Sequence, residues 1–199
     1  MPVYLVRHAE TDSNATRVVQ LPDAALSERG HTQAARLAAR FVREGVAAIV
    51  SSDLRRAAAT AEAVRAATGA PLTHDAGLRE RDYGALRGVA YAAITADIFA
   101  PDFEPPGGET WAAFYSRVDA AWDRVRTQAA ATEGNLVVIT HGLVIRAMVE
   151  RHLELPSGLA VGLARANTAV TVIDGDPPTR VRILDCATHL DTASDGSAV

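Results

Sequence analysis

The sequence contains no lysine, so all 20 of its basic residues are arginine. Schiff-base catalysis and a Walker-type phosphate loop both require a lysine amine, so both are excluded. The single cysteine, Cys186, cannot build a disulfide framework, and it predicts a reducing, cytoplasmic location. No apolar run approaches the roughly 20 residues of a membrane-spanning helix, so we expect no membrane association.

The charge balance gives no sign of a nucleic-acid partner, because the net charge is −4 and nucleic-acid-binding surfaces are basic. Apolar residues make up 48% and charged residues 22%, which is typical of a globular protein. A length of 199 residues is enough for one sizeable core, so we expect a single domain over residues 1–190. The small, polar residues 191–199 predict a flexible tail, and we expect a monomer or a symmetric homodimer.

Short apolar runs that fit strands alternate with longer segments whose apolar residues recur at helical spacing. The expected strands are 3–6, 46–50, 136–140, and a hairpin of 169–173 with 181–184; the expected helices are 27–42, 54–67, 110–130 and one through Ile145 and Met148. This alternation predicts an α/β fold with three layers, α/β/α, and a mostly parallel sheet with an antiparallel edge strand. The irregular segment 88–109 is expected to form a cap or lid with a short helix around 91–98.

Polar residues follow three of the expected strands, at the point where each strand ends. They form three groups: Arg7-His8 with Thr11 and Asn14 close behind, Ser51-Ser52-Asp53 with Arg55 and Arg56, and Thr140-His141-Gly142. Ligands of open α/β sheets bind beyond the carboxyl ends of the strands. If these strands are parallel neighbours, two histidines and several arginines converge on one crevice.

Such a crevice favours a phosphate group, because arginine offers planar donor forks and helix N-termini offer free N–H groups. A neighbouring cation lowers the pKa of His8, so its imidazole stays neutral and can act as a nucleophile. The leaving alcohol then needs a proton donor, and the segment "GLRERDYGALRG" offers Glu80 and Asp82. Each residue alone has an ordinary structural explanation, so the prediction depends on their shared position at one edge of the sheet.

At this point the motifs resemble a known family. "LVRHAET" followed by Asn14 resembles the Arg-His-Gly-Glu signature of the histidine phosphatase superfamily, in its phosphoglycerate-mutase-like branch. The later motifs resemble those of the family in order and over nearly the whole chain: "SSDLRRAAATA", "LRERDYGALRG", "PPGGET", "VVITHG" and "ANTAVTV". The match implies Arg56 rather than Arg55 as the second arginine, and Glu80 rather than Asp82 as the acid.

The resemblance implies a mechanism in which His8 attacks phosphorus and becomes a phosphohistidine, while Glu80 protonates the leaving oxygen and later activates water. It implies no metal and no cofactor. The implied phosphate and substrate ligands are Arg7, Asn14, Arg56, His141, Gly142 and Leu143, with Thr11, Arg81 and Tyr83 as weaker candidates. Four departures from the family pattern affect substrate contacts: Ala9 replaces a glycine, Ala25 a proline and Leu143 an asparagine, and the segment around Gln20-Leu21-Pro22 is a residue short.

The short segment 89–109 favours a phosphatase over a mutase. Family mutases carry a longer insertion here with basic residues, whereas this segment has no arginine and contains Asp97, Asp102, Glu104 and Glu109. A mutase must protect its phosphohistidine from water, and a short cap admits water. We therefore expect a short, phosphatase-type member, a phosphomonoesterase acting on a small phosphorylated metabolite.

Three alternatives stay open. The first is a cofactor-dependent phosphoglycerate mutase, because cations near the mouth of the site can come from Arg17, Arg79, Arg81 and Arg87. The other two are a metal hydrolase that uses both strand-end histidines and a non-catalytic module that binds a phosphorylated ligand. Neither histidine has a metal-ligand spacing such as H-E-x-x-H, which counts against the metal hydrolase.

Overall fold

A six-stranded sheet forms the centre of the protein; the computed structural model describes residues 2–157, 166–175 and 178–191. The sheet has the order β3-β2-β4-β1-β5-β6, with strands β1 (Val3–Arg7), β2 (Val46–Ser51), β3 (Leu72–His74), β4 (Asn135–Thr140), β5 (Val170–Gly175) and β6 (Pro178–Cys186). The first four strands are parallel, and the antiparallel hairpin β5–β6 joins them through an antiparallel β1–β5 pair. The predicted, mostly parallel sheet is confirmed, with the antiparallel strand β5 one place in from the edge strand β6.

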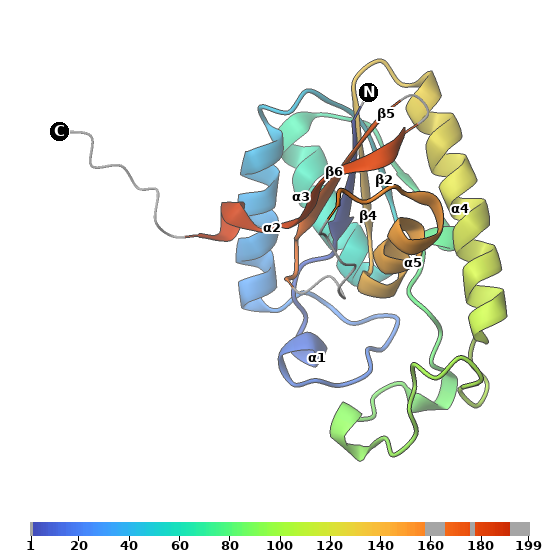
Figure 1. Cartoon of the computed structure of the whole chain (residues 1–199). Coiled ribbons are helices and arrows are strands. Elements are labelled where there is room, and N and C mark those ends of the chain that lie inside the picture. The colour runs from blue at the N-terminus through green and yellow to red at the C-terminus, as the bar shows by residue number, and fades with distance from the viewer. Residues whose placement is uncertain (1, 158–165, 176–177, 192–199) are drawn as a thin grey trace.

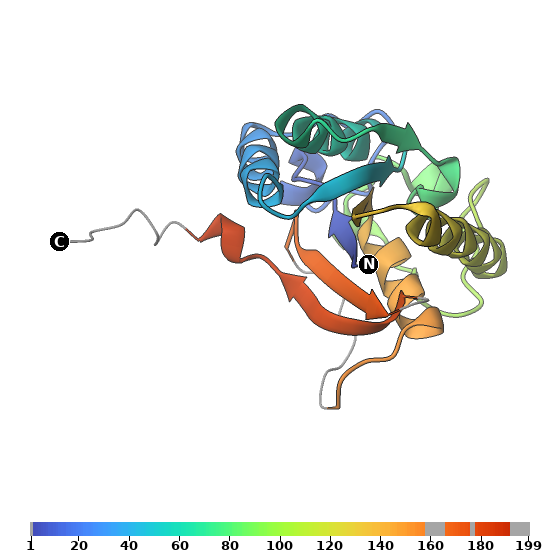
Figure 2. The same cartoon turned by 90° about the horizontal axis from the view of Figure 1, so that it is seen from above.

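Helices cover both faces of this sheet (Figures 1 and 2). On one face, Tyr4 and Val6 pack in a cluster with residues of α2 (Glu28–Phe41) and α3 (Arg55–Thr68). On the other face, Val3 and Leu5 pack with α4 (Trp111–Ala131) and α5 (Gly142–His152). Alternate residues of β1 thus serve opposite layers, because successive side chains of a strand point to opposite faces. The three-layer α/β/α prediction is confirmed.

The helix ends follow local capping rules. Ser27 Oγ accepts a hydrogen bond from Gly30 N at 3.0 Å and so begins α2 where the sequence predicted. Gly69 ends α3 with a φ of 71°, in the left-handed region that glycine favours. Val42 lies just past the end of α2 and is exposed, so the helix ends one residue before the predicted limit of 42.

Several short elements were not predicted. They are β3, the four-residue helix α1 (Asp12–Ala15), and 3-10 turns at Ala76–Leu78, Gly84–Leu86 and Thr188–Leu190. The predicted helix around 91–98 is wrong in extent, because only the 3-10 turn Tyr91–Ala93 forms there. Residues 176–177 of the predicted hairpin turn and residues 192–199 of the predicted tail lie outside the described part of the chain.

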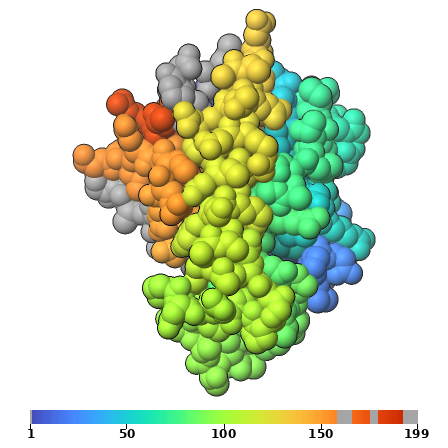
Figure 3. Space-filling model, turned by 90° about the vertical axis from the view of Figure 1, so that its right-hand side faces the viewer, coloured from blue at the N-terminus to red at the C-terminus, as the bar shows by residue number. Residues whose placement is uncertain are grey.

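The segment 88–109 forms a lobe beside the first turn of α4, at the carboxyl end of the sheet (Figures 1 and 3). Arg81, which is almost fully buried, holds it to the body of the domain. Its guanidinium donates to the carbonyls of Ile98 at 3.1 Å, Phe103 at 2.7 Å and Glu109 at 3.0 Å, and lies 3.8 Å from the centre of the Trp111 ring. These contacts tie an irregular stretch to one buried cation. Among the described helices, none has the length and apolar character needed to cross a bilayer.

Candidate active site

A cavity of about 290 Å³ opens beyond the carboxyl ends of the parallel strands, with Arg7, His8, Arg56 and Glu80 among its lining residues. The sheet register explains why residues distant in sequence meet there. Arg7 pairs with Thr140 across the β1–β4 ladder, so the residues after each strand, His8 and His141, lie side by side. Their ring centroids are 5.0 Å apart.

His8 is held as a neutral imidazole with a defined tautomer. Its Nδ1 lies 2.7 Å from the carbonyl oxygen of Ala9. A carbonyl oxygen only accepts, so Nδ1 carries the proton and Nε2 keeps its lone pair. Burial, reinforced by Arg56 and Arg7, lowers the pKa of His8 well below its usual value. The ring is therefore an available nucleophile over a wide pH range.

Arg7 and Arg56 place two cations against this histidine. Arg56 is 3% exposed and donates to the carbonyl of Leu21 at 3.2 Å. Its Nε has no hydrogen-bond partner among the described residues. Burial lowers the pKa of Arg56 to about 10 and also lowers the pKa of Arg7, yet both remain cations at neutral pH. One buried and one half-buried cation in the same cavity favour binding of an anion.

His141 lies behind the cavity at the N-cap of α5 and is fully buried. Its Nε2 lies 2.9 Å from Ser52 Oγ, while its Nδ1 has no partner within the described part of the chain. Burial, followed by the charge of Arg56, lowers its pKa well below the usual value. Ser52 was placed at the end of a strand by the sequence, but its contact with His141 was not foreseen.

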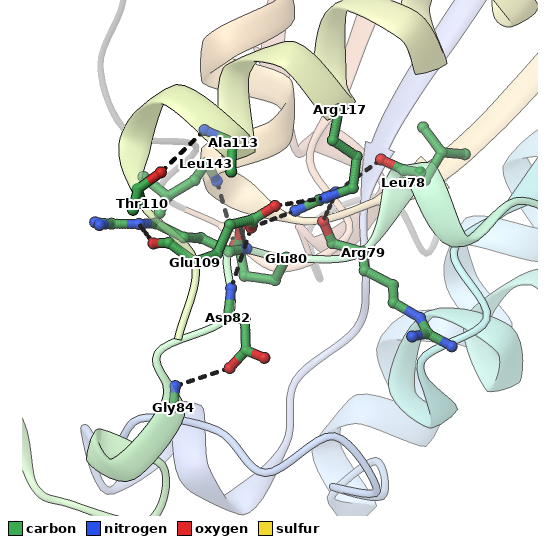
Figure 4. Close-up of polar contacts among 12 residues, drawn as sticks. Leu78, Arg79, Glu80, Asp82, Gly84, Glu109, Thr110, Ala113, Arg117 and Leu143 are labelled. Carbon is green, nitrogen blue, oxygen red and sulfur yellow. Dashed lines mark hydrogen bonds and ion pairs between the residues drawn. The ribbon is translucent and has the colours of Figure 1, made fainter. Parts of the chain in front are cut away.

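Glu80 reaches the cavity from the irregular stretch after the 3-10 turn Ala76–Leu78. Its two carboxylate oxygens accept from Arg81 N at 3.0 Å and Leu143 N at 3.3 Å (Figure 4). Burial raises the pKa of Glu80 and outweighs these hydrogen bonds and the nearby arginines. A raised pKa suits a carboxylic acid that must donate a proton near neutral pH. Asp82, the other sequence candidate, instead pairs with Arg87 and accepts from Gly84 N at 2.7 Å.

Most of the remaining predicted residues line the cavity, and four of them are Asn14, Tyr83, Gly142 and Leu143. Of the others, Thr11 is buried and caps α1, and its hydroxyl donates to Gln20 at 2.9 Å. Arg81 also borders the cavity, but its guanidinium is engaged with three backbone carbonyls, which favours a structural role.

Residues that the sequence did not single out also shape the site. Tyr91 and Phe99, both from the segment 88–109, line the cavity. Burial and the nearby Glu80 raise the pKa of Tyr91. Asn167 donates to the carbonyl of His8 at 2.9 Å and to Asn14 Oδ1 at 3.3 Å, and so fixes the backbone of the nucleophile. No pattern marked the two aromatics, whereas Asn167 lies within the quoted "ANTAVTV" motif.

The described residues contain no group of three or more His, Cys, Asp and Glu side chains arranged to hold a metal ion. Arg56 and Arg7 lie close enough to both strand-end histidines to lower the pKa of each ring. The donor set around them is therefore that of an anion site.

A family model described as the histidine phosphatase superfamily (branch 1) matches residues 3–184. The chain belongs to this superfamily. Two curated relatives, from Shigella boydii serotype 18 and Salmonella paratyphi B, are each named probable phosphoglycerate mutase GpmB. They are 32% identical over 184 and 185 residues, which cover 87% of this chain and 85% of each relative.

Solved structures of the superfamily have the same fold. A mycobacterial glucosyl-3-phosphoglycerate phosphatase, solved in complex with VO3, is 28% identical with a TM-score of 0.79, covering 93% of this chain and 99% of that chain. Bacillus stearothermophilus YhfR is 28% identical with a TM-score of 0.81, covering 96% and 99%. The predicted family is confirmed. The names of its relatives include both a phosphatase and probable mutases.

Proposed function

We propose that the protein is a metal-independent phosphomonoesterase that hydrolyses a small phosphorylated metabolite through a phosphohistidine on His8. The observation that carries this proposal is the state of His8, a neutral ring whose Nδ1–H donates to the Ala9 carbonyl, beside the buried Arg56 and the half-buried Arg7. Nε2 is then the nucleophilic atom. The arginines hold the phosphoryl oxygens and repel a metal cation.

The first step forms a bond from His8 Nε2 to phosphorus and breaks the bond from phosphorus to the leaving oxygen. Protonated Glu80 gives its proton to that oxygen, which leaves as the alcohol. Arg7, Arg56 and His141 stabilise the charge on the transferred group, with Asn14 at its edge. Nδ1–H donates to the Ala9 carbonyl throughout, so the phosphorylated ring keeps its orientation.

The second step hydrolyses the intermediate. Glu80, now a carboxylate, takes a proton from a water molecule as the water attacks phosphorus, and the bond to Nε2 breaks. Phosphate is released, and Glu80 and His8 return to their starting states. We place the reaction in the cytoplasm on the strength of the single cysteine, with the protein acting as a monomer or homodimer.

The decisive experiment measures hydrolysis of p-nitrophenyl phosphate in EDTA and traps acid-labile phosphate on the protein by rapid quench. We expect turnover without metal, and a loss of at least about 10³-fold in His8→Ala, because the nucleophile is gone. His31→Ala is a matched control, since His31 is exposed on α2. Turnover that requires added metal, or wild-type rates in His8→Ala, would contradict the proposal.

Phosphoglycerate mutase activity is the second candidate, favoured by the names of the two relatives that are 32% identical. It uses the same phosphohistidine but returns the phosphoryl group to a second hydroxyl of the substrate. Incubation with 3-phosphoglycerate and a trace of its bisphosphate separates the two activities. Accumulation of 2-phosphoglycerate supports the mutase. Its absence, together with release of inorganic phosphate from p-nitrophenyl phosphate, supports the phosphatase. Stable phosphate binding without turnover of any ester would favour a binding module.

A further inference from the structure

The outer part of the cavity contains arginines that are already neutralised. Among the described residues five arginines line the cavity: Arg7, Arg56, Arg79, Arg81 and Arg87. The first two lie beside His8, and Arg81 is occupied by backbone carbonyls. The last two remain as the cations that a second charged group of a substrate would meet.

Each of these two arginines is paired with a carboxylate. Arg79 donates to both carboxylate oxygens of Asp53, from Nε to Oδ1 at 2.6 Å and from Nη2 to Oδ2. Arg87 Nη2 lies 2.5 Å from Asp82 Oδ2. Arg17, the other cation that the sequence offered for the mouth, is exposed and is not among the described residues that line the cavity.

The rest of the outer lining is uncharged. Tyr91 and Phe99 are 38% and 46% exposed, and both border the cavity with Leu54 and Pro22. A substrate carboxylate that approached Arg79 or Arg87 would meet Asp53 or Asp82, already bound to that arginine, at close range. Like charges brought together in this way disfavour binding. The uncharged alcohol portion of a substrate brings no negative charge near these aspartates, and it can pack against the aromatic rings.

We propose that Asp53 and Asp82 are specificity-determining residues, which neutralise Arg79 and Arg87 so that the site accepts phosphate monoesters of uncharged alcohols and rejects esters that carry a carboxylate. This proposal rests on the proposed phosphomonoesterase function and names its substrate class. It assigns the outer ion pairs a selective role in addition to any contribution to folding.

The test compares glycerol 3-phosphate with 3-phosphoglycerate, which share a three-carbon skeleton and a primary leaving oxygen but differ in one carboxylate. We expect kcat/KM of the wild-type protein to be higher for glycerol 3-phosphate. In Asp82→Asn and Asp53→Asn one arginine loses its counter-charge, so the ratio should move toward 3-phosphoglycerate by about two- to fivefold in each. Asparagine at 82 keeps an oxygen to accept from Gly84 N.

Asp119→Asn is the matched control, because it removes one carboxylate from an ion pair with Arg151 that is not part of the cavity lining. It should leave the ratio unchanged. A wild-type preference for 3-phosphoglycerate, or equal ratios in all three variants, would overturn the proposal.

Calorimetric binding of both esters to His8→Ala, alone and combined with each Asp→Asn change, gives the same comparison without turnover. Absence of hydrolysis would therefore contradict the proposed function separately, while the binding ratio still decides the substrate class. The same two- to fivefold shift, about the value of an exposed ion pair, is expected in the binding constants. Tighter binding of 3-phosphoglycerate to His8→Ala alone would overturn the selectivity.

Discussion

The inner and outer ends of the cavity use the same cationic side chain in opposite settings. At the inner end Arg56 is 3% exposed, and burial lowers its pKa to about 10. At the outer end the Arg79 side chain is 51% exposed, and its hydrogen bonds to Asp53 raise its pKa. The inner cation carries a cost of desolvation that a bound anion relieves, whereas the outer one is already compensated by a carboxylate.

This difference shows why counting arginines does not locate a phosphate site. The chain has no lysine, so every cation is an arginine and residue type carries no information about role. The burial of an arginine side chain and the group that it pairs with decide what that arginine does. A buried arginine beside a neutral histidine binds and polarises a phosphoryl group, and an exposed arginine on an aspartate contributes little to either binding or stability.

The largest expected difference in kcat/KM is between a variant that lacks one inner arginine and a variant that lacks one outer arginine. We expect Arg56→Gln to lower kcat/KM for p-nitrophenyl phosphate by about 10²–10³-fold, the usual loss for one preorganised donor to developing negative charge. Arg79→Gln should change it by less than about fivefold, because the Arg79–Asp53 pair is largely exposed. Steady-state kinetics and the inhibition constant of inorganic phosphate measure both effects.

Thermal unfolding of the two variants serves as the control for folding. If Arg56→Gln remains folded with the expected loss, the effect belongs to the site. Similar losses in Arg56→Gln and Arg79→Gln would mean that the two ends of the cavity do not differ as described.

The inner end was predictable from the sequence because it depends on strand order. His8 and His141 each follow a buried apolar strand, and the ends of parallel strands share one edge of a sheet. The long helices were predictable for a similar reason, since their apolar spacing and caps are local signals. Ser27, which caps the start of α2, and Gly69, which ends α3, are two such local signals.

The outer end was not predictable, because its residues come from irregular chain. Tyr91 and Phe99 enter the cavity on a segment whose path depends on Arg81 and on an ion pair between Arg117 and Glu109 (Figure 4). Such long-range contacts leave no periodic pattern. The edge strand β3 was missed on similar grounds, since three residues are too few to show alternation.

Glu80 stands between the two ends, and its replacement should produce the next largest effect. Because its pKa is raised, Glu80 stays protonated to higher pH than an ordinary glutamate. The acid form donates the proton, so kcat/KM for an alkyl phosphate should fall as pH rises through the pKa of Glu80. At low pH, activity falls when His8 becomes protonated, because only the neutral ring can attack. The lowered pKa of His8 places this acidic limb of the pH profile well below the usual histidine range.

In Glu80→Gln the alkaline limb should disappear, and kcat/KM should fall about 10²-fold or more for an alkyl ester. For p-nitrophenyl phosphate, whose leaving group needs no proton, the loss should be about tenfold or less. We use kcat/KM because it reports formation of the phosphohistidine and excludes its later hydrolysis. Equal losses on both esters, or a pH profile that keeps its alkaline limb, would remove Glu80 from the role of general acid.

The smallest expected effect lies behind the inner end, at Ser52. Its hydroxyl accepts from Leu54 N at 3.3 Å and lies 2.9 Å from His141 Nε2. When this hydroxyl donates to Nε2, neutral His141 must carry its proton on Nδ1, the atom without a partner among the described residues. His141 then offers a donor to the phosphoryl group. We expect Ser52→Ala to lower kcat/KM about tenfold, as for other residues that orient a site histidine.

The neighbouring Ser51 is the matched control, because it is also fully buried but its hydroxyl donates to the carbonyl of Ser52 at 2.8 Å, whereas the His141 ring pairs with the Ser52 hydroxyl. Nitrogen-15 shifts of the His141 ring should report a change of tautomer in Ser52→Ala and none in Ser51→Ala. Ser52→Thr, which keeps the hydroxyl, should recover both the shift and the rate. If Ser52→Ala and Ser51→Ala slow the enzyme equally with the tautomer unchanged, Ser52 supports only the packing of the strand end. The contrast between the two ends of the cavity would then depend on the arginines alone.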